Sequence, residues 1–299
     1  MAWFLYPDGA MKPAPFRYLR ARSSAEALDL KAEHGDEAKF LAGGQSLIPT
    51  MNFRLAQPAI LIDINALAEL DGVRMDDGGL RIGALTRYRT LERDALVAHH
   101  QPLVREALPQ IAHPQIRNRG TLGGNLANAD PASELPAVVL ALGGRLRAQS
   151  VHGERWIEAA DFFLGALTTA LEPDEMLTEI VLAIAPPRTG TCFLEVARRR
   201  GDFALMGVAA VVTLAPDGTC TDARLTYCGA ADTPVAAPDA AASLLGRIIG
   251  EDDIRSAAAL AERDLDPPGN MHAGKGFQRH LAGVLTRRAL EAAVARARQ

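Results

Sequence analysis

The sequence predicts an α+β protein of two domains, and three observations lead to this prediction. In the first half of the 299-residue chain, short apolar segments alternate with glycine turns and helical patterns. Pro186 and Pro187 then interrupt the chain. Beyond them, three strand-like segments precede three alanine-rich helical segments, an order that is typical of an α+β domain. A chain of this length can bury the cores of two domains of ordinary size.

Regular structure is expected to begin with a helix, followed by a strand, a turn and a second helix. Ser23 and Glu26 have the spacing of a capping box, and Gly35 stands where a left-handed C-terminal cap belongs, so a helix is expected between them. The segment "KFLAGGQSLIPTM", residues 39–51, predicts a short strand, a Gly-Gly turn and a short helix that begins at Ser46.

A buried strand, two hairpins and two helices are expected in the rest of the first domain. The strand is continuous in apolar and β-branched residues, and each hairpin alternates apolar with polar positions around a tight turn. The expected elements are the strand at 59–64, the hairpins at 73–82 and 145–158, and the helices at 102–112 and 134–142.

The second domain is expected to hold three strands followed by three helices. Their ranges are 192–198, 206–214, 221–229, 236–249, 251–264 and 276–297. The last helix carries arginines around an apolar stripe, and charges on an amphipathic helix usually lie on a solvated face. A solvated or subunit-facing surface is therefore expected at Arg279, Arg287, Arg288, Arg296 and Arg298.

Composition excludes several classes of function. Apolar residues make up 48% and charged residues 23% of the chain, with both signs mixed, as in folded globular proteins. The net charge of -4 gives no electrostatic reason to expect nucleic acid or an anionic membrane as a partner. No apolar run approaches the roughly 20 residues that cross a bilayer, so no membrane span is expected.

The cysteines and histidines indicate a reducing compartment and no metal site. Cys192, Cys220 and Cys228 are odd in number and irregular in spacing, so they predict neither a disulfide framework nor a four-thiolate metal site. The seven histidines show no metal-ligand spacing. A cytoplasmic location is the expectation that follows.

The first ten residues stand apart from the rest. The segment "MAWFLYPDGA" has no periodicity, and its apolar part is too short for the core of a signal peptide. The segment "MKPAPF", which follows from Met11, makes a natural start. We expect residues 1–10 to come from an upstream start codon or from a cloning remnant, which N-terminal sequencing of the native protein tests.

Four Gly-Gly pairs occur, and they fall into two kinds. Gly78-Gly79 and Gly143-Gly144 stand beside alternating strand patterns, where a tight turn with positive φ explains them. Gly43-Gly44 and Gly123-Gly124 each follow an apolar segment and have hydroxyl or amide neighbours, in "AGGQS" and "TLGGN". Consecutive glycines let backbone N–H groups turn toward one point and form a nest for an anion.

Two such loops from distant parts of the chain suit a dinucleotide, because they can grip its diphosphate from two sides. A helix that begins at Ser46 would add free N–H groups, and the hydroxyls of Ser46 and Thr121 can donate to phosphate oxygens. Asp130 and Glu134 supply carboxylates downstream. Either loop taken alone is better explained by a plain turn, and it is the pair of loops together with these carboxylates that favours a ligand. The sequence has neither a P-loop motif nor a G-x-G-x-x-G after a first strand, so those two nucleotide sites are not expected.

The segments "AGGQSLIP" and "TLGGNLANADPASELP" together resemble the two diphosphate-binding loops of the FAD-binding medium subunit of molybdenum hydroxylases, the family of xanthine dehydrogenase and aerobic carbon monoxide dehydrogenase. The similarity runs from Met11 over nearly all of the chain, through "HPQIRNRGTLGGN", "DEMLTEI" and "ARRRGDFALMGVAAVV". It implies an FAD-binding domain of the vanillyl-alcohol-oxidase (PCMH) type, built from two α/β subdomains, over residues 11–185. It also implies a C-terminal domain of the carbon monoxide dehydrogenase flavoprotein type, with a three-stranded antiparallel sheet and helices, over residues 188–297.

The resemblance also implies which residues contact FAD. The two loops correspond to Leu41, Ala42, Gly43, Gly44, Gln45, Ser46, Leu47 and Ile48, and to Thr121, Gly123, Gly124 and Asn125. Ile111 would lie near the adenine, Glu134 would bond the ribityl chain, and Leu177 would meet the isoalloxazine through its backbone. Phe203 would lie close to the ring, where some members have tyrosine, and it keeps the aromatic surface without the hydroxyl. Gln45 stands where other members have histidine, so the FAD is expected to be non-covalent.

From the residues alone, some of these positions have a plainer explanation. Glu134 suits a cap at the start of a helix as well as it suits a ribityl contact. Leu177 in a strand is typical of a core position. The arginines at 198–200 can neutralise a phosphate, face a partner or simply be solvated. Asp202 can accept a bond from the flavin side or pair with these arginines.

The resemblance implies an electron-transfer function, because a flavin converts between two-electron and one-electron carriers. In the family, a molybdenum cofactor on a large subunit oxidises the substrate, two [2Fe-2S] clusters on a small subunit relay electrons, and FAD on the medium subunit passes them to an external acceptor. The cysteines of this chain cannot hold a cluster, so both the clusters and the molybdenum cofactor are expected on partner subunits. The expected assembly is a dimer of heterotrimers.

Two other functions stay open beside this one. A self-contained flavin reductase of similar fold, such as those that reduce cell-wall nucleotide sugars, would need its own proton donor and substrate-binding residues, and the sequence shows no convincing set. A structural subunit that has lost flavin is disfavoured by the two intact loops. The electron acceptor is open among quinone, NAD, oxygen and a dedicated protein, and the substrate binds on another chain.

Overall fold

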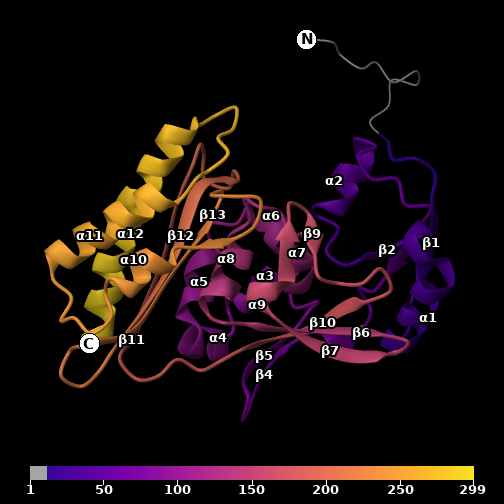
Figure 1. Cartoon of the computed structure of the whole chain (residues 1–299). Coiled ribbons are helices and arrows are strands. Elements are labelled where there is room, and N and C mark those ends of the chain that lie inside the picture. The colour runs from indigo at the N-terminus through magenta and orange to yellow at the C-terminus, as the bar shows by residue number, and fades with distance from the viewer. Residues whose placement is uncertain (1–11) are drawn as a thin grey trace.

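Three larger sheets organise the chain, of which the computed structural model describes residues 12–299. Figure 1 shows them in a row, with the N-terminal sheet at the right, the middle sheet with its helices at the centre, and the C-terminal sheet with its orange and yellow helices at the left. The mixed α+β class predicted from the sequence is confirmed. The expectation for residues 1–10 lies outside the described residues.

A parallel sheet in the order β1-β3-β2 forms the N-terminal part. Its elements are β1 (Arg17–Arg20), α1 (Ser24–His34), β2 (Ala38–Leu41), α2 (Leu47–Asn52) and β3 (Ile60–Asp63), with 3-10 turns at Gly35–Glu37 and Ala68–Leu70. β3 is central, which explains its continuous apolar run. Ser23 caps α1 by accepting from the Glu26 N–H, as predicted. The Glu26 carboxylate accepts from the N–H of Arg22 at 2.7 Å instead of Ser23, so the capping box is shifted by one residue.

An antiparallel sheet in the order β4-β5-β10-β6-β7 forms the middle part. Its elements are β4 (Val73–Asp76), β5 (Gly79–Gly83), α3 (Tyr88–Leu91), α4 (Ala95–His100), α5 (Pro102–Ala107), α6 (Pro114–Arg117), α7 (Leu122–Asn128), α8 (Glu134–Ala141), β6 (Arg145–Ser150), β7 (Gly153–Glu158), α9 (Ala159–Phe162), β8 (Phe163–Gly165), β9 (Thr168–Thr169) and β10 (Met176–Leu182). Both predicted hairpins are present, and positive φ at Gly79 and Gly143 fits the turns expected there.

An antiparallel sheet in the order β11-β12-β13-β14 forms the C-terminal part. Its elements are β11 (Thr189–Ala197), β12 (Ala204–Leu214), β13 (Cys220–Cys228), β14 (Val235–Ala236), α10 (Pro238–Ala242), α11 (Glu251–Asp264) and α12 (Lys275–Ala297). The three predicted strands are present, and the two-residue β14 extends their sheet. β12 is buried on both faces, because Val208 packs in the core shared with the C-terminal helices and Ala209 packs in the core of the middle part.

Two expected helices are shorter than predicted. The helix expected at 102–112 ends at Ala107, because the N–H groups of Gln110 and Ile111 bond carbonyls three residues back and Ala112 turns left-handed with φ of 46°. The helix expected at 236–249 ends at Ala242. There, Gly246 and Arg247 exchange backbone hydrogen bonds with Cys220 at the start of β13, so tertiary bonds replace the helical ones.

Helix α8 joins the middle part to the C-terminal sheet. The Thr226 hydroxyl on β13 donates to the Ala137 carbonyl at 2.7 Å, and Arg224 on the same strand donates to the Ala141 carbonyl at 3.2 Å. Four of the five arginines expected on a solvated or subunit-facing surface of α12 are exposed, and Arg279 is half-buried. Glu134, the site residue predicted on α8, therefore begins a helix that packs against the C-terminal sheet.

Candidate functional site

The two glycine loops that the sequence singled out lie against each other. A Cβ atom built on Gly43 would stand 2.5 Å from the carbonyl oxygen of Arg119 and 3.0 Å from the Cα atom of Gly120. Gly124 lies close on the other side, since a Cβ there would be 3.5 Å from the Cβ atom of Ala42. The fold thus brings together two segments that are about 80 residues apart in sequence. Only glycine permits so close an approach at position 43, because any Cβ atom would clash with the Arg119 carbonyl.

The first loop presents a run of backbone donors. Within the described chain, the N–H groups of residues 43–47 have no protein acceptor, whereas the next N–H, that of Ile48, bonds the Gly44 carbonyl at 3.1 Å. Gly44 has φ of 71°, the left-handed conformation of a nest. Gln45 braces the turn by donating from Nε2 to the Gly43 carbonyl at 2.9 Å. Five consecutive unsatisfied donors are typical of an anion site.

The second loop differs from the expected nest. Gly123 and Gly124 lie in the first turn of α7, and their N–H groups are already bonded to the Ala84 carbonyl at 2.8 Å and to the Thr121 hydroxyl oxygen at 3.1 Å. Thr121 is thus the helix cap, and its hydroxyl proton is left to donate to a ligand. A Cβ on Gly123 would meet that of Ala84 at 2.4 Å, so this glycine serves close packing.

Downstream of the second loop, polar side chains gather at the start of α8. The Asn125 carboxamide exchanges two hydrogen bonds with the Ser133 hydroxyl, at 2.7 and 2.9 Å. Glu134 begins α8 and is buried, with 4% of its surface exposed. Burial, with the nearby Glu195 and Asp130, raises the pKa of Glu134 to about 8. The position of Glu134 in the first turn of α8 is consistent with a helix-capping role. Its burial near Asn125 and Ser133 is consistent with a contact to a polar ligand.

Glu195 is a site candidate that the sequence did not reveal. It lies on β11, and its Oε2 atom is buried without a hydrogen-bond partner in the described part of the molecule. Burial raises its pKa to about 7. The buried thiol of Cys228 lies close to both Glu195 and Glu134, and they raise its pKa further. A lone acidic residue within the apolar start of "FLEVARR" was the available signal.

The three other predicted FAD contacts, Ile111, Leu177 and Phe203, lie in different parts of the molecule. Ile111 and Leu177 are buried in the core of the middle part, and Thr178, next to Leu177, accepts from the N–H of Ala84 beneath the second loop. Phe203 is 65% exposed in the turn between β11 and β12. The structure therefore brings Leu177 near the second loop and sets Phe203 at the surface.

The arginine run before Phe203 is exposed, as one of the open explanations expected. Arg198 lies 3.3 Å from the ring of His272, and Arg200 lines a cavity of about 480 Å³ with Ala112, His113, Pro114 and Arg117. Within residues 12–299, no ion pair joins Asp202 to these arginines. The run thus borders the segment that follows Ile111.

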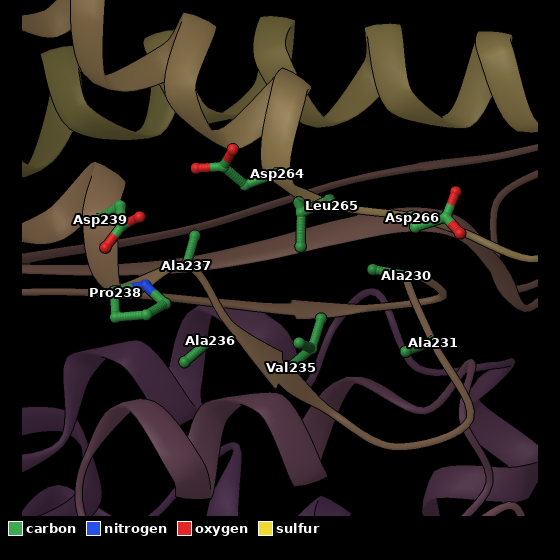
Figure 2. Close-up of a pocket in the computed structure, with 10 residues that line it drawn as sticks. All are labelled: Ala230, Ala231, Val235, Ala236, Ala237, Pro238, Asp239, Asp264, Leu265 and Asp266. Atoms are coloured by element: carbon green, nitrogen blue, oxygen red, sulfur yellow. The ribbon is translucent and has the colours of Figure 1, made fainter.

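A second pocket lies away from the loops, in the C-terminal domain. Figure 2 shows it between the segment that leads into α10 and the end of α11, with the carboxylates of Asp239, Asp264 and Asp266 around an apolar floor. Its volume is about 310 Å³, and it contains none of the predicted site residues. Asp264 and Asp266 are paired with Arg263 and Arg279, so these two acids are neutralised.

The cysteines, the possible metal ligands and the hydropathy of the helices complete the description of residues 12–299. The three cysteines are buried free thiols. Residues 12–299 contain no group of three or more histidine, cysteine or acidic side chains placed to hold a metal ion. Over the same residues, no helix has the length and hydropathy that a bilayer crossing requires.

Two family models match the chain. The FAD binding domain in molybdopterin dehydrogenase matches residues 14–183, and the CO dehydrogenase flavoprotein C-terminal domain matches residues 191–293. Among relatives, a 6-hydroxypseudooxynicotine dehydrogenase complex subunit alpha of Paenarthrobacter nicotinovorans is 40% identical over 96% of this chain and 97% of its own length. The carbon monoxide dehydrogenase medium chain of Afipia carboxidovorans is 37% identical over 96% of this chain and all of its own length.

Solved structures agree with these matches. A chain of carbon monoxide dehydrogenase from Hydrogenophaga pseudoflava superposes with a TM-score of 0.92 at 37% identity, over 95% of this chain and 99% of that one. A chain of quinoline 2-oxidoreductase from Pseudomonas putida 86 gives 0.91 at 34% identity, over 96% of this chain and all of that one. This chain therefore belongs to the FAD-binding medium subunits of the molybdenum hydroxylases, an oxidoreductase family that includes the medium chain of carbon monoxide dehydrogenase and the FAD-binding subunit of xanthine dehydrogenase.

Proposed function

We propose that this chain takes electrons from [2Fe-2S] clusters of a partner subunit onto its FAD and passes them to an external acceptor. The single observation that carries the proposal is the run of unsatisfied N–H groups at residues 43–47, backed by the second loop. Such donors suit the two negative charges of a diphosphate, which FAD has at its centre. The bound flavin supplies the exchange between two-electron and one-electron carriers.

The residues of the two loops fit FAD in distinct roles. Leu41, Ala42, Gly43, Gly44, Gln45, Ser46, Leu47 and Ile48 form the segment that donates to the diphosphate. Thr121 donates its free hydroxyl proton, Gly123 and Gly124 keep the second loop close, and Asn125 and Glu134 bond the ribityl chain. Ile111, Leu177 and Phe203 complete the contacts with the two ring systems. The Gln45 amide is not a nucleophile, so the FAD is non-covalent.

The other redox centres belong to partner subunits in this proposal. A [2Fe-2S] cluster takes four cysteine ligands, and this chain has three cysteines, which are buried and irregularly spaced. Several relatives are themselves called subunits or medium chains, which implies further chains beside them. We infer a large molybdenum-cofactor subunit and a small cluster subunit, arranged as a dimer of heterotrimers in the cytoplasm. The FAD domain is assigned to residues 11–185 and the C-terminal domain to residues 188–297.

Electron transfer between purified components tests the proposal. The FAD-loaded chain is mixed without oxygen with its cluster-bearing partner subunit, whose clusters have been reduced, and the flavin absorbance is followed. Bleaching of the flavin at the rate of cluster reoxidation is the expected result. A flavin that stays oxidised contradicts the proposed direction of electron flow.

FAD binding itself needs a separate measurement. The full chain is titrated with FAD, and its thermal unfolding is recorded with and without the cofactor. Saturable binding, stabilisation by FAD and release of the flavin on acid denaturation are expected. A chain that is neither coloured nor stabilised by FAD supports the flavin-free structural subunit instead.

A further inference from the structure

One polar side chain, that of Asn65, holds the two carbonyl groups that precede Gly43. Asn65 stands just after β3, and its Nδ2 atom donates to the Leu41 carbonyl at 3.1 Å and to the Ala42 carbonyl at 2.8 Å. Asp63 fixes the Asn65 side chain in turn, because its Oδ1 atom accepts from the Asn65 backbone N–H at 2.9 Å and from Nδ2 at 2.6 Å. The first loop is therefore tied to the end of the central strand.

This tie decides which way the first donor of the loop points. All described peptide bonds are trans, and in a trans peptide the carbonyl and the following N–H point in opposite directions. Since the Ala42 carbonyl faces Asn65, the N–H of Gly43 faces away from Asn65. Gln45 acts in the same way one residue later, because its bond to the Gly43 carbonyl directs the N–H of Gly44 away from the Gln45 side chain.

The second connection is made by Arg87, whose guanidinium joins both loops. Its Nη2 atom donates to Oδ1 of Asn65 at 2.5 Å, and its Nη1 atom donates to the Arg119 carbonyl, the group that packs against Gly43. The backbone around Arg87 is also paired with the second loop, because the Tyr88 N–H bonds the Gly120 carbonyl at 3.0 Å. The planar guanidinium thus bridges the two loops with two donors of fixed geometry.

We propose that Asn65 and Arg87 are positioning residues for FAD, which orient the donors of the first loop and fix its distance from the second. This inference rests on the proposed function, because the diphosphate that meets the first loop is that of FAD. We call the pair the loop strut. Neither residue is a predicted FAD contact, and the strut acts through the backbone of residues 41–43 and 119.

The charge of Arg87 is an alternative source of any effect on an anionic ligand. Arg87 is half-buried, and burial together with the neighbouring Arg119 lowers its pKa, but an arginine stays cationic in proteins. A lysine at this position keeps the positive charge and loses the two-armed geometry. Arg87→Lys therefore separates an electrostatic role from a positioning role.

The test measures the affinity of the full chain for FAD and for ADP, which carries the diphosphate without the flavin. In Asn65→Leu, Arg87→Ala and Arg87→Lys, the dissociation constant for each ligand is expected to rise by about tenfold or more, as for the loss of a charge-assisted hydrogen bond. Because the two residues act together, their effects should not add. The double variant Asn65→Leu/Arg87→Ala should bind FAD and ADP about as tightly as whichever single variant binds them more weakly.

Arg155→Ala is the matched control. Arg155 also bridges one carbonyl and one side chain, those of Ala170 and Glu175, but it touches neither loop. It is expected to lower the unfolding temperature without changing either affinity.

Three outcomes decide the matter. If Asn65→Leu and Arg87→Ala bind FAD and ADP with wild-type affinity, the positioning role is wrong. It is also wrong if Arg87→Lys binds them as the wild type does, because the effect of Arg87→Ala would then come from the lost charge. A wild-type chain that does not bind FAD contradicts the proposed function instead, and ADP binding then reports on the strut alone.

Discussion

The Gly43 Cα atom and the Arg119 carbonyl oxygen are packed so closely that no side chain fits between them. A Cβ atom on Gly43 would lie 2.5 Å from that oxygen. Gly43 does not have a positive φ, so a larger residue is excluded here by lack of space and not by backbone conformation. The contact sets the distance between the two loops.

Gly43→Ala is therefore expected to push the loops apart and weaken FAD binding by about tenfold or more, since overpacking a tight contact costs roughly 1–3 kcal/mol. Gly143→Ala is the control. Its φ of 60° strains an alanine, but its Cβ would meet only the end of the Arg224 side chain, at 3.2 Å. FAD titration and thermal unfolding of both variants should show lost affinity only in Gly43→Ala. Equal losses of affinity in the two variants would mean that the first loop is a structural turn without a specific role in binding FAD.

Glu134→Leu should distinguish a ribityl contact from a helix cap. If the carboxyl group bonds the ribityl chain, the variant binds FAD about tenfold more weakly and binds ADP as the wild type does, because ADP has no ribityl chain. If Glu134 only caps α8, both affinities stay unchanged and only the unfolding free energy falls. Isothermal titration with the two ligands separates these results, and we expect the first.

Stability of the flavin-free chain should fall as the pH rises, because Glu134 and Glu195 have raised pKa values in the folded state. Their pKa values of about 8 and about 7 lie above the ordinary value of 4.5, so the folded chain binds more protons than the unfolded chain over this range. The stability contributed by protonation is therefore lost from about pH 4.5 to about pH 8. Each group contributes a slope of up to about 1.4 kcal/mol per pH unit.

Denaturant unfolding across this range measures the slope. Glu134→Gln and Glu195→Gln should each flatten it and stabilise the chain at its alkaline end, since the neutral amide resembles the protonated acid. The exposed Glu158→Gln should leave the slope as in the wild type. If both buried variants keep the wild-type dependence of unfolding free energy on pH, groups other than Glu134 and Glu195 cause that dependence.

The contact between α5 and the C-terminal domain depends on Glu106 more than on its ionic partner. Glu106 accepts from Arg296 of α12 at 2.6 Å and from the backbone N–H of Phe193 on β11 at 3.1 Å. Glu106→Ala leaves that N–H without an acceptor and should cost about 1–3 kcal/mol in the free energy of unfolding. Arg296→Ala removes a partly exposed ion pair and the hydrogen bond to the Thr191 carbonyl, and it should cost about 1 kcal/mol or less, because a carbonyl tolerates a lost partner better than an N–H does. Urea unfolding checks the order, which a larger loss in Arg296→Ala would contradict.

Much of the fold follows from local signals in the sequence. The apolar run at 59–64 is a buried parallel strand, the glycine turn at 78–79 closes a hairpin, the glycine turn at 143–144 leads from α8 into β6, and Ser23 caps the first helix. These signals are reliable because periodicity and turn conformation act over a few residues. Helix ends were less predictable at 107, where local bonds three residues back and the left-handed Ala112 end the helix, and at 242, where backbone bonds to Cys220 replace helical bonds.

The candidate site was predictable only in part. The two loops were identified by their glycines, but the sequence suggested a nest at both. Within residues 12–299, the first loop has a run of free backbone donors, whereas the N–H groups of Gly123 and Gly124 bond the Ala84 carbonyl and the Thr121 hydroxyl oxygen. Asn65 and Glu195 were missed, although a polar residue directly after a buried parallel strand, as Asn65 is, signals a ligand edge.

The sequence by itself determined the composition class, the strands and turns, the pair of glycine loops and the resemblance to a family. Tertiary structure alone decided that the loops touch, that Asn65 and Arg87 join them, and that Glu134 lies buried near Glu195. The physical reason is the range of the forces involved. Backbone conformation and hydrophobic periodicity are local, whereas hydrogen-bond partners, steric exclusion and desolvation depend on which distant segments the folded core brings together.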